Sequence, residues 1–427
     1  MKAEQIIERA MRCAEGAQAT ISRSESVPVS FESGRLKTIK TTHSIRVDLR
    51  VIVDGKLGSS HTTDENDIDG LVDRAVEAAA FGRSVMFSFP SPQAAPVVET
   101  YDPAVVSCSK EEMVGIGEEM VGMVRTYDPH VVVYAGVNKT ISRLDFANSS
   151  GMQFSAEGTH FSVNVYGNRI RGTDILWAGD GFGWRRRDVD HRKIASRVIE
   201  RFRWAERLAR TSSNNMPVLF TPMGMSVLLI ALLEGFNGKN VLLGSSPLAG
   251  NIGEQVFSER FSLTDDGTVD YASASARYDG EGVPHRRLPL VEQGIVRHFL
   301  YDLDIASKAG VQSTGHGPGC GPTNWFIEEG ATSYGDLIAS VDEGIIVEQG
   351  MGLGQGNVIG GEFSVNVSLG YKIEKGEIVG RVKDVMLTGN VYDALRHVGA
   401  VGDEAEWTWG AVKTPPILIE RLSVVAK

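Results

Sequence analysis

Zinc-dependent hydrolysis would place strict demands on the histidines of this sequence. A catalytic zinc needs three protein ligands around one open position, usually with a nearby carboxylate that takes the proton of the bound water. Two histidines on one helix are the simplest way to begin such a site. The nine histidines all lie more than one or two helical turns apart: His43, His61, His130, His160, His191, His285, His298, His316 and His397. The sequence therefore has no local zinc motif, but this spacing does not exclude a zinc site whose ligands come from distant strands.

A second place for chemistry is the loop Gly315-His316-Gly317-Pro318-Gly319-Cys320-Gly321-Pro322. The nitrogen of His316 and the sulfur of Cys320 could hold one metal ion, and the pair could form a nucleophile with its base. The favoured interpretation is a loop whose shape, set by glycine and proline, matters more than its side chains. A hydrolytic site dispersed over His316, Cys320, Asp265 and Glu281 stays the alternative from the enzyme class.

Binding of nucleic acid or phosphate is disfavoured. The formal net charge of −11 would repel a polyphosphate chain. The arginine-rich stretch 190–211 carries an apolar stripe that includes Ile194, Val198 and Phe202, so we expect a buried helix face with a solvated basic face opposite. The glycines of Gly352-x-Gly354-x-Gly356 lead into another strand instead of a helix, which argues against a phosphate-binding loop.

Cysteine usage and hydropathy favour a cytoplasmic protein. Cys13, Cys108 and Cys320 are widely scattered, which fits a reducing compartment better than a disulfide framework. The first twenty residues contain no apolar segment of the kind that a secretion signal has. The longest apolar run, Val227–Leu233, is far shorter than the ~20 residues of a membrane-spanning helix. We therefore expect a soluble, cytoplasmic chain with no membrane partner.

These residues must be positioned by two regions, which we expect at 1–211 and 212–427. Apolar spacing predicts helices over 3–18, with Cys13 on its buried face, from about 68 to 79, from a cap at Ser109 to about 125, and over 190–211. Alternating residues predict strands over 28–61, with a turn at Asp54-Gly55, and over 131–167. The first region is therefore expected to be an α+β domain with helices on an antiparallel sheet.

The second region is expected to be rich in strands. One apolar helix is predicted around 225–236, and short helices near 303–309 and 334–341. Most of the remaining residues alternate or are glycine, with six glycines between Gly350 and Gly361 and a turn signal at 374–377. This pattern predicts a large curved antiparallel sheet or partial barrel.

Ordered segments over nearly the whole chain resemble the TldD/PmbA family (peptidase U62, "modulator of DNA gyrase"). Each segment alone is weak, but their order is specific. The segments are Val53–Gly58, Gly253–Ser258, Asp265–Thr268, Asp279–Pro284, Tyr301–Leu303, Ser313–Gly317, Gly352–Asn357 and Gly360–Ser364. The resemblance also implies the curved C-terminal sheet.

The resemblance implies that the catalytic motif of the family has been lost here. Catalytic TldD-type members have His-Glu-x-x-x-His, and aligned on that motif the two histidines fall on Ile230 and Gly235 and the glutamate on Ala231. Those members also carry a cysteine near the C-terminus, and the corresponding stretch, 407–416, has none. Glu234 is expected to be a carboxylate of the last helical turn or of an interface. The chain thus resembles the PmbA/TldE branch, with no catalytic residue and no metal ligand of its own.

By this resemblance the chain would be a silent subunit that pairs with a TldD-type zinc subunit. Together they would form a cytoplasmic peptidase that acts on short or unfolded peptides, held by main-chain hydrogen bonds to a sheet edge. The zinc would belong to the partner, and association with a second copy of this chain when the partner is missing stays open. Two alternatives remain: the autonomous hydrolase with a dispersed site, and a regulator that binds a gyrase-related protein or a toxin–antitoxin pair without proteolysis.

Overall fold

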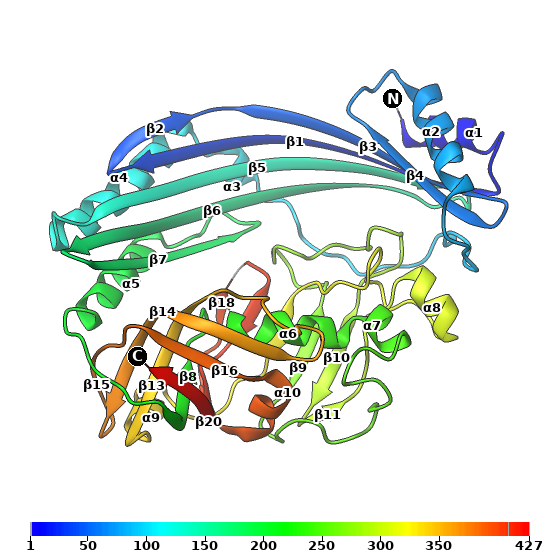
Figure 1. The fold of residues 1–427 in the computed structure, drawn as a ribbon. Coiled ribbons are helices and arrows are strands. Elements are labelled where there is room, and N and C mark those ends of the chain that lie inside the picture. The colour runs from blue at the N-terminus through cyan, green and yellow to red at the C-terminus, as the bar shows by residue number, and fades with distance from the viewer. Residues whose placement is uncertain (1, 409, 427) are drawn as a thin grey trace.

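A long arched antiparallel sheet forms the upper layer of the molecule in Figure 1. The computed structural model describes residues 2–408 and 410–426. The strand order is β4-β3-β1-β5-β6-β7, and β2 pairs with β1 beside this path. The strands are β1 (Gly16–Glu32), β2 (Arg35–Ile39), β3 (Thr42–Val53), β4 (Lys56–Thr62), β5 (Val132–Asn148), β6 (Gln153–Arg171) and β7 (Asp174–Trp184).

Alternation along these strands explains the sheet. Val47, Leu49 and Val51 of β3 are fully buried and face the helices, while the residues between them are more exposed. The predicted turn at Asp54 and Gly55 joins β3 to β4, and both residues have positive φ, 49° and 65°, as a tight two-residue hairpin requires. The strand and turn predictions for this region are confirmed.

Five helices accompany this sheet, and the first differs from its prediction. They are α1 (Ala3–Ala10), α2 (Ile68–Ala80), α3 (Pro103–Ser107), α4 (Lys110–Tyr127) and α5 (His191–Trp204). The prediction of a helix over 3–18 with a buried Cys13 is wrong, because α1 ends eight residues earlier and Cys13 is exposed. The chain is already in β1 there, and Ala17, Ala19 and Ile21 of this strand belong to the hydrophobic cluster beneath α1 and α2.

The longer helices follow their predicted caps more closely. The capping box at Ser109 is present, with Ser109 Oγ accepting from Glu112 N at 3.1 Å and Glu112 Oε2 accepting from Ser109 N at 2.7 Å. Helix α5 ends at Trp204 instead of near 211, because Arg207 and Ala209 exchange backbone hydrogen bonds with Arg381 on β15. In the described part of the chain no helix is long and apolar enough to cross a membrane.

The lower half contains two sheets instead of the one expected. One has the order β13-β8-β20-β16-β14-β15 with β17 beside β20, and the other has the order β11-β10-β9-β12-β19-β18. The sheets are mainly antiparallel, as predicted, but β8 runs parallel to β13 and β12 parallel to β19. The curved, barrel-like arrangement in Figure 1 agrees with the predicted partial barrel.

The bounds of these elements are as follows. The strands are β8 (Asn214–Phe220), β9 (Leu263–Asp266), β10 (Arg287–Glu292), β11 (Ile295–Val296), β12 (Trp325–Ile327), β13 (Glu343–Met351), β14 (Glu362–Glu374), β15 (Glu377–Arg381), β16 (Val385–Asn390), β17 (Val398–Val401), β18 (Glu406–Thr408), β19 (Val412–Thr414) and β20 (Ile417–Ala426). The helices are α6 (Ser226–Phe236), α7 (Gly238–Leu242), α8 (Leu303–Ala309), α9 (Tyr334–Ala339), α10 (Val391–Ala394) and the 3₁₀ turn Leu395–His397.

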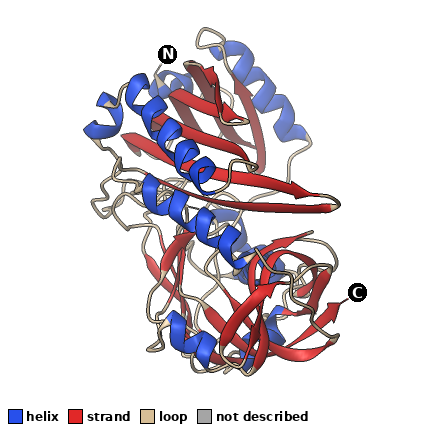
Figure 2. Ribbon diagram, turned by 90° about the vertical axis from the view of Figure 1, so that its left-hand side faces the viewer, coloured by secondary structure: helices blue, strands red, loops and turns tan. Residues whose placement is uncertain are grey.

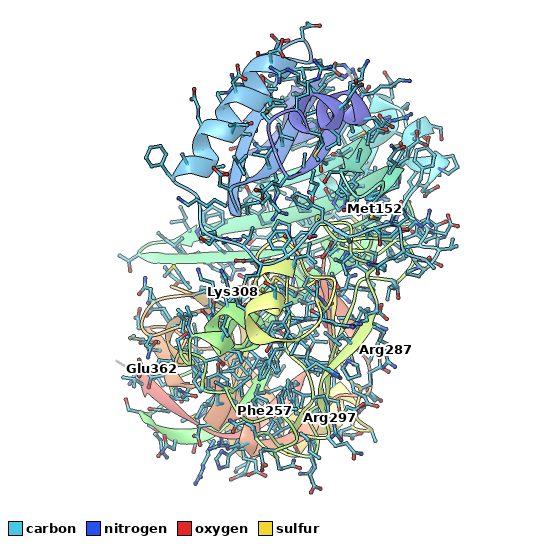
Figure 3. The ribbon with its side chains drawn as sticks, turned by 90° about the vertical axis from the view of Figure 1, so that its right-hand side faces the viewer. Met152, Phe257, Arg287, Arg297, Lys308 and Glu362 are labelled. Atoms are coloured by element: carbon cyan, nitrogen blue, oxygen red, sulfur yellow. The ribbon has the colours of Figure 1, made fainter. Side chains whose placement is uncertain are left out.

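Three hydrophobic clusters hold these layers. One lies beneath α1 and α2, one fills the lower half around α6, and the third joins the upper sheet to the lower half through α4 and α5. Phe202 of α5 and Tyr371 of β14 belong to this shared cluster, and Figure 2 shows a helix layer between the two sets of strands. At the other end, Met152 lies at the junction of the two halves (Figure 3). Because one core crosses the junction, the division of the chain at residue 212 stays a prediction.

Candidate functional site

The first candidate position is the face of α6 that carries Ile230 and Glu234. Ser226, Ile230 and Glu234 are spaced four residues apart and so lie on one face of the helix. Ile230 is half-buried, whereas Ala231 is 3% exposed and points into the core. Neither side chain has an atom that could bind a metal or take a proton.

Gly235 is closed to any side chain. A Cβ atom built on Gly235 would lie 2.4 Å from the hydroxyl oxygen of Tyr392 on α10. The Tyr392 ring cannot easily move away, because its other edge lies against Gly361, where a built Cβ would meet Cε2 at 2.4 Å. The ring is 6% exposed. The family's zinc therefore does not fit this helix, since two of its ligand positions carry a hydrocarbon and a covered glycine.

Glu234 lies in the last turn of α6 and is tied to α7. Its Oε2 and its backbone oxygen both accept hydrogen bonds from Asn240 Nδ2, at 2.8 and 2.9 Å. Glu234 also lines a cavity of about 450 Å³ whose wall includes Cys320, Asp302 and Lys239. The structure thus brings Glu234 and Cys320 to one cavity, while the contacts of Glu234 are those of a carboxylate that fastens a helix end.

Hydrogen bonds to a hydroxyl group and a carboxylate hold His316, and Cys320 is not one of its partners. Its Nε2 lies 2.9 Å from Asp265 Oδ1, its Nδ1 lies 2.9 Å from Thr314 Oγ1, and the residue is 4% exposed. Both ring nitrogens are therefore occupied. The structure brings together two members of the dispersed site, His316 and Asp265, but buries them from solvent.

Cys320 is buried, and its surroundings favour the neutral thiol. Its Sγ accepts a hydrogen bond from the backbone nitrogen of Asp302 at 3.2 Å, and the residue is 1% exposed. Burial raises the pKa of Cys320 to about 12, and the nearby Asp302 and Glu281 charges act in the same direction. A nucleophilic cysteine needs a lowered pKa, so this environment opposes catalysis by Cys320.

Buried carboxylates shape the loop that carries these residues. Backbone nitrogens of the loop donate to Asp279 from Gly317 at 2.7 Å, to Asp302 from Gly319 at 2.9 Å, and to Asp265 from Thr323 at 2.7 Å. The three donors lie in the segment Gly317 to Thr323, so the buried carboxylates hold the backbone of this segment in place. We call these carboxylates the frame of the loop. Within residues 2–408 and 410–426, no group of three histidine, cysteine, aspartate or glutamate side chains could hold a metal ion.

Glu281, the fourth member of the dispersed site, has the same structural role. Its Oε1 accepts from Arg50 at 2.8 Å and its Oε2 from the backbone nitrogen of Leu303 at 2.8 Å. Burial raises the pKa of Glu281, and the Arg50 guanidinium opposes that rise. The structure therefore places His316, Asp265, Glu281 and Cys320 in one frame around a loop, not around an open substrate site.

The sequence stretch 407–416, where a catalytic relative carries a cysteine, forms the strands β18 and β19 and their connection. Trp407 and Thr408 lie in β18, and Val412, Lys413 and Thr414 in β19. Trp409 of the same stretch lies outside the described residues. None of the described side chains here is a usual zinc ligand.

Sequence reasoning missed a cleft between the upper sheet and the lower half. Asp180 of β7, Arg201 of α5 and Glu348 of β13 meet there: Arg201 Nε donates to Glu348 Oε1 at 2.6 Å, and Arg201 Nη1 lies 3.4 Å from Asp180 Oδ1. Arg201 is 9% exposed, so the expectation that its stretch only forms a solvated basic face is wrong for this residue. Burial lowers the pKa of Arg201, but the Glu348 and Asp180 charges outweigh it and raise that pKa.

No local spacing could have revealed this cleft, because Arg201 and Glu348 are 147 residues apart. A second hollow adjoins it and shares Gly181, Met223 and Thr408 with it. The first residue of α6, Ser226, lines that hollow. The cleft therefore extends to the helix that carries the degenerate motif.

Two family models match the sequence. One, described as the PmbA/TldA metallopeptidase C-terminal domain, matches residues 213–426, and one described as PmbA/TldA metallopeptidase domain 1 matches residues 17–79. Named relatives align over most of their length. A metalloprotease PmbA homologue of Haemophilus influenzae is 23% identical over 98% of this chain and 94% of its own. A metalloprotease of Methanothermobacter thermautotrophicus is 26% identical over 91% of this chain and 87% of its own.

A solved structure shares the fold. The crystal structure of TldE from Thermococcus kodakarensis superposes with a TM-score of 0.91 at 24% identity, covering 99% of each chain. The likeness extends over both halves of the molecule. Because the C-terminal family model alone spans half of the sequence, this chain belongs to the PmbA/TldD metallopeptidase family.

Proposed function

We propose that this chain is the non-catalytic, PmbA/TldE-like subunit of a two-subunit cytoplasmic metallopeptidase. The zinc and the catalytic residues belong to a TldD-type partner, and this chain carries no cofactor. The substrates are short or unfolded peptides, which the two subunits hold in a shared chamber.

The observation that supports the silent role most strongly is the environment of Gly235. The position has no side chain, and the Tyr392 hydroxyl occupies the space that a ligand would need. A histidine there would require displacement of a buried ring. The metal site is therefore absent from this helix for two reasons. Ile230 and Ala231 have no ligand atoms, and the packing around Gly235 leaves no room for a histidine.

An exposed aromatic cluster supports an interface on the upper sheet. Tyr134, Tyr166 and Trp177 lie side by side on β5, β6 and β7, with ring centroids 5.1 to 6.2 Å apart. Tyr166 is 39% exposed and Trp177 46% exposed, and Ile170 and Ile175 beside them are more exposed still. Large exposed apolar patches of this kind mark protein interfaces, and tyrosine and tryptophan are enriched at their centres.

The carboxylate frame around Cys320 favours this proposal over an autonomous hydrolase. The dispersed candidates are buried and hydrogen-bonded to backbone, and burial raises the pKa of the only nucleophile among them. No specific contact favours the regulator that binds a gyrase-related protein. The subunit proposal accounts for both the closed α6 and the open aromatic patch.

Co-expression with a TldD-type partner tests the proposal. This chain alone should hold no stoichiometric zinc and cleave no peptide. The 1:1 complex should cleave unfolded peptides, lose activity with a chelator and bury well over about 2,000 Å² in total. Elemental analysis, size-exclusion chromatography with light scattering and a peptide-cleavage assay provide the readouts.

A matched pair of variants locates the interface. Trp177→Asp should weaken the complex at least about tenfold, because it places a charge in the centre of the aromatic patch. Phe81→Asp, at a residue that is 95% exposed outside the patch, should leave assembly unchanged. Chelator-sensitive cleavage by this chain alone, at a rate that the partner does not raise, would contradict the proposal.

A further inference from the structure

The cleft between β7 and the lower half is strongly acidic. It has a volume of about 430 Å³ and is bordered by β7 and α5 above and by the β8–α6 turn, β13 and β18 below. Six carboxylates line it against two guanidinium groups. The carboxylates are Asp180, Glu200, Glu348, Asp403, Glu404 and Glu406, and the guanidinium groups are those of Arg197 and Arg201.

The two arginines are already used inside the protein. Arg201 is held by Glu348 and Asp180, and Arg197 donates to Glu406 and lies 3.7 Å from Asp180 Oδ2. Lys193 Nζ at the rim lies 3.7 Å from Glu406 as well. The internal cations therefore compensate the deeper carboxylates.

Three carboxylates at the mouth have no such partner. Among the described residues, no lysine, arginine or histidine nitrogen lies within 4 Å of Glu200, Asp403 or Glu404. All three are exposed. The mouth of the cleft thus retains an uncompensated negative field, and the low-dielectric walls concentrate such a field.

Two buried polar atoms inside the cleft also lack hydrogen-bond partners. The Asp180 side chain is 7% exposed, yet its Oδ2 has no hydrogen bond in the described part of the chain. The hydroxyl of Tyr334, on the opposite wall, is buried and has none either. A buried polar atom without a hydrogen bond is costly, so both atoms indicate a polar ligand. Asp180 Oδ2 can only accept, as from an N–H group, whereas the Tyr334 hydroxyl can also donate to a carbonyl oxygen.

Aromatic rings complete the walls. Trp204, Tyr334 and Trp407 line the same cleft as the carboxylates. The face of an aromatic ring attracts an ammonium or guanidinium group, and the attraction grows when water is excluded. Carboxylates, acceptor oxygens and aromatic faces in one concave site are the combination that recognises an organic cation.

Side chains of the protein already occupy part of the β7 backbone edge beside the cleft, on either side of Gly181. On β7 the carbonyl of Gly179 accepts from Arg201 at 2.8 Å and the carbonyl of Gly183 accepts from Ser273 at 3.1 Å. Residues two apart on a strand direct their backbone groups to the same side, so Gly181 between them presents its N–H and C=O outward as well. Gly181 lines the cleft, and a built Cβ there would clash with Asn164, so the strand stays bare at this point.

We propose that this cleft binds a positively charged group of an extended peptide, with the peptide backbone along β7 at Gly181 and its cationic group between the carboxylates and the aromatic rings. The inference rests on the proposed role in peptide binding and adds a preference for lysine- or arginine-containing segments. Mechanistically, the site positions the peptide and performs no bond cleavage.

Blocked synthetic peptides test this preference. The probe is acetylated, amidated Gly-Ala-Lys-Ala-Gly, and its matched control replaces lysine with norleucine, which keeps the alkyl chain and removes the charge. Binding is measured by calorimetry on the chain alone and on the chelator-treated complex. The lysine peptide should bind about tenfold more tightly, and the difference should shrink as salt rises.

Paired variants assign the effect to the cleft. Asp403→Asn with Glu404→Gln should reduce the preference for lysine several-fold, because it removes two uncompensated charges at the mouth. The double variant Glu374→Gln with Glu377→Gln removes the same charge at the exposed β14–β15 hairpin and should leave the preference intact. Equal loss in both double variants would overturn the inference.

A third peptide separates the two sources of positive charge. The norleucine peptide with a free amino terminus should bind less tightly than the lysine peptide if a side chain is recognised, and equally tightly if the terminal ammonium group is the ligand. Either result supports a cation site. Equal binding of the blocked lysine and norleucine peptides, or no binding of either, overturns it, even if the complex forms and cleaves as proposed above.

Discussion

Single atoms decide whether the degenerate motif could work. The Tyr392 hydroxyl lies where a side chain at position 235 would begin, and the ring is fixed between Gly235 and Gly361. Tyr392 also has a raised pKa, about 12, because it is buried and because the Glu234 charge is near. The oxygen is thus a neutral hydroxyl group at neutral pH, held in a position that excludes even a methyl group.

We predict that Gly235→Ala destabilises the chain by about 1 to 3 kcal/mol, the usual cost of forcing extra atoms into a packed core. Alanine is the better helix former, so in the absence of the clash the same change should stabilise α6 slightly. Urea denaturation measures the difference. In a Tyr392→Phe background the cost should shrink to the smaller clash with ring carbons at 3.2 and 3.3 Å, and an unchanged cost there would show that the hydroxyl is not responsible.

Restoring the motif tests the same packing at the level of function. The triple variant Ile230→His, Ala231→Glu, Gly235→His should gain no chelator-sensitive peptidase activity, because the third ligand and the residues that orient the ligands are absent. A gain of activity would show that the scaffold needs only these three side chains.

His285 makes the fold sensitive to acid. The residue is 8% exposed, its Nδ1 has no hydrogen-bond partner among the described residues, and the His316 ring lies 6.2 Å away. Burial lowers the pKa of His285 to about 4, and the His316 charge acts in the same direction. In the unfolded chain this imidazole binds a proton below about pH 6.5, whereas in the folded chain it does so only near pH 4. Protonation therefore does not lower the free energy of unfolding above about pH 6.5.

We predict that this stability is lost as pH falls from about 6.5 to about 4, up to a total of about 3 kcal/mol. His285→Asn should remove most of that dependence. Free energies of unfolding at pH 7 and pH 4.5, compared between the two proteins, cancel the contribution of other titrating groups. The same loss in both proteins would assign the acid sensitivity elsewhere.

At the scale of elements, α6 is a core helix, and its run of apolar residues already predicted a helix around 225–236. Its apolar residues surround it on nearly all sides, and Leu228, Leu229 and Leu232 are at most 5% exposed. Ile230, Leu233 and Glu234 are the residues of this helix that reach partial exposure. The helix therefore contributes mainly to stability, and its ends reach different hollows: Ser226 lines the hollow that adjoins the cleft, and Glu234 lines the cavity near Cys320.

We predict that Leu229→Ala costs about 2 to 5 kcal/mol in the free energy of unfolding, the range for emptying a buried leucine site. Leu243→Ala is the matched control, because Leu243 is 68% exposed just beyond α7, and its effect should stay within about 0.5 kcal/mol. Chemical denaturation of both variants provides the comparison. A change below half a kcal/mol at Leu229 would mean that α6 does not carry the core.

At the scale of the whole molecule, a buried ion pair joins the two halves. Arg201 belongs to α5 beneath the upper sheet, and Glu348 to β13 of the lower half, and the shared hydrophobic cluster surrounds them. The backbone oxygen of Arg201 also accepts from the Tyr371 hydroxyl at 3.1 Å. The relative position of the halves, and with it the shape of the acidic cleft, depends on this contact.

We predict that Arg201→Met destabilises the chain by about 3 to 5 kcal/mol, because it leaves Glu348 buried without its cation, while Asp180 keeps only Arg197 at 3.7 Å. The double variant Arg201→Met, Glu348→Met should recover a large part of this loss, since no uncompensated Glu348 charge remains. A double-mutant cycle by urea denaturation measures the coupling energy. Additive losses would show that the two residues stabilise the halves independently.

Some features followed from the sequence alone, because their causes are local. Alternation predicted the long strands, Asp54-Gly55 predicted the hairpin, and Ser109 with Glu112 predicted the start of α4. The ordered family segments and the loss of the motif at α6 could be identified from the residue types. Helix ends were less predictable: α1 and α5 stop early because strand pairing competes for the following residues.

Only the tertiary structure decided which distant residues meet. No spacing in the sequence could show that Tyr392 covers Gly235, that buried carboxylates frame the His316–Cys320 loop, or that Asp180, Arg201 and Glu348 meet in one cleft. Local preferences act over a few residues, whereas these contacts come from packing between segments that are distant in the sequence, such as those of Arg201 and Glu348, which are 147 residues apart. The sequence thus determined the family and the missing ligands, and the fold determined where the remaining charges are concentrated.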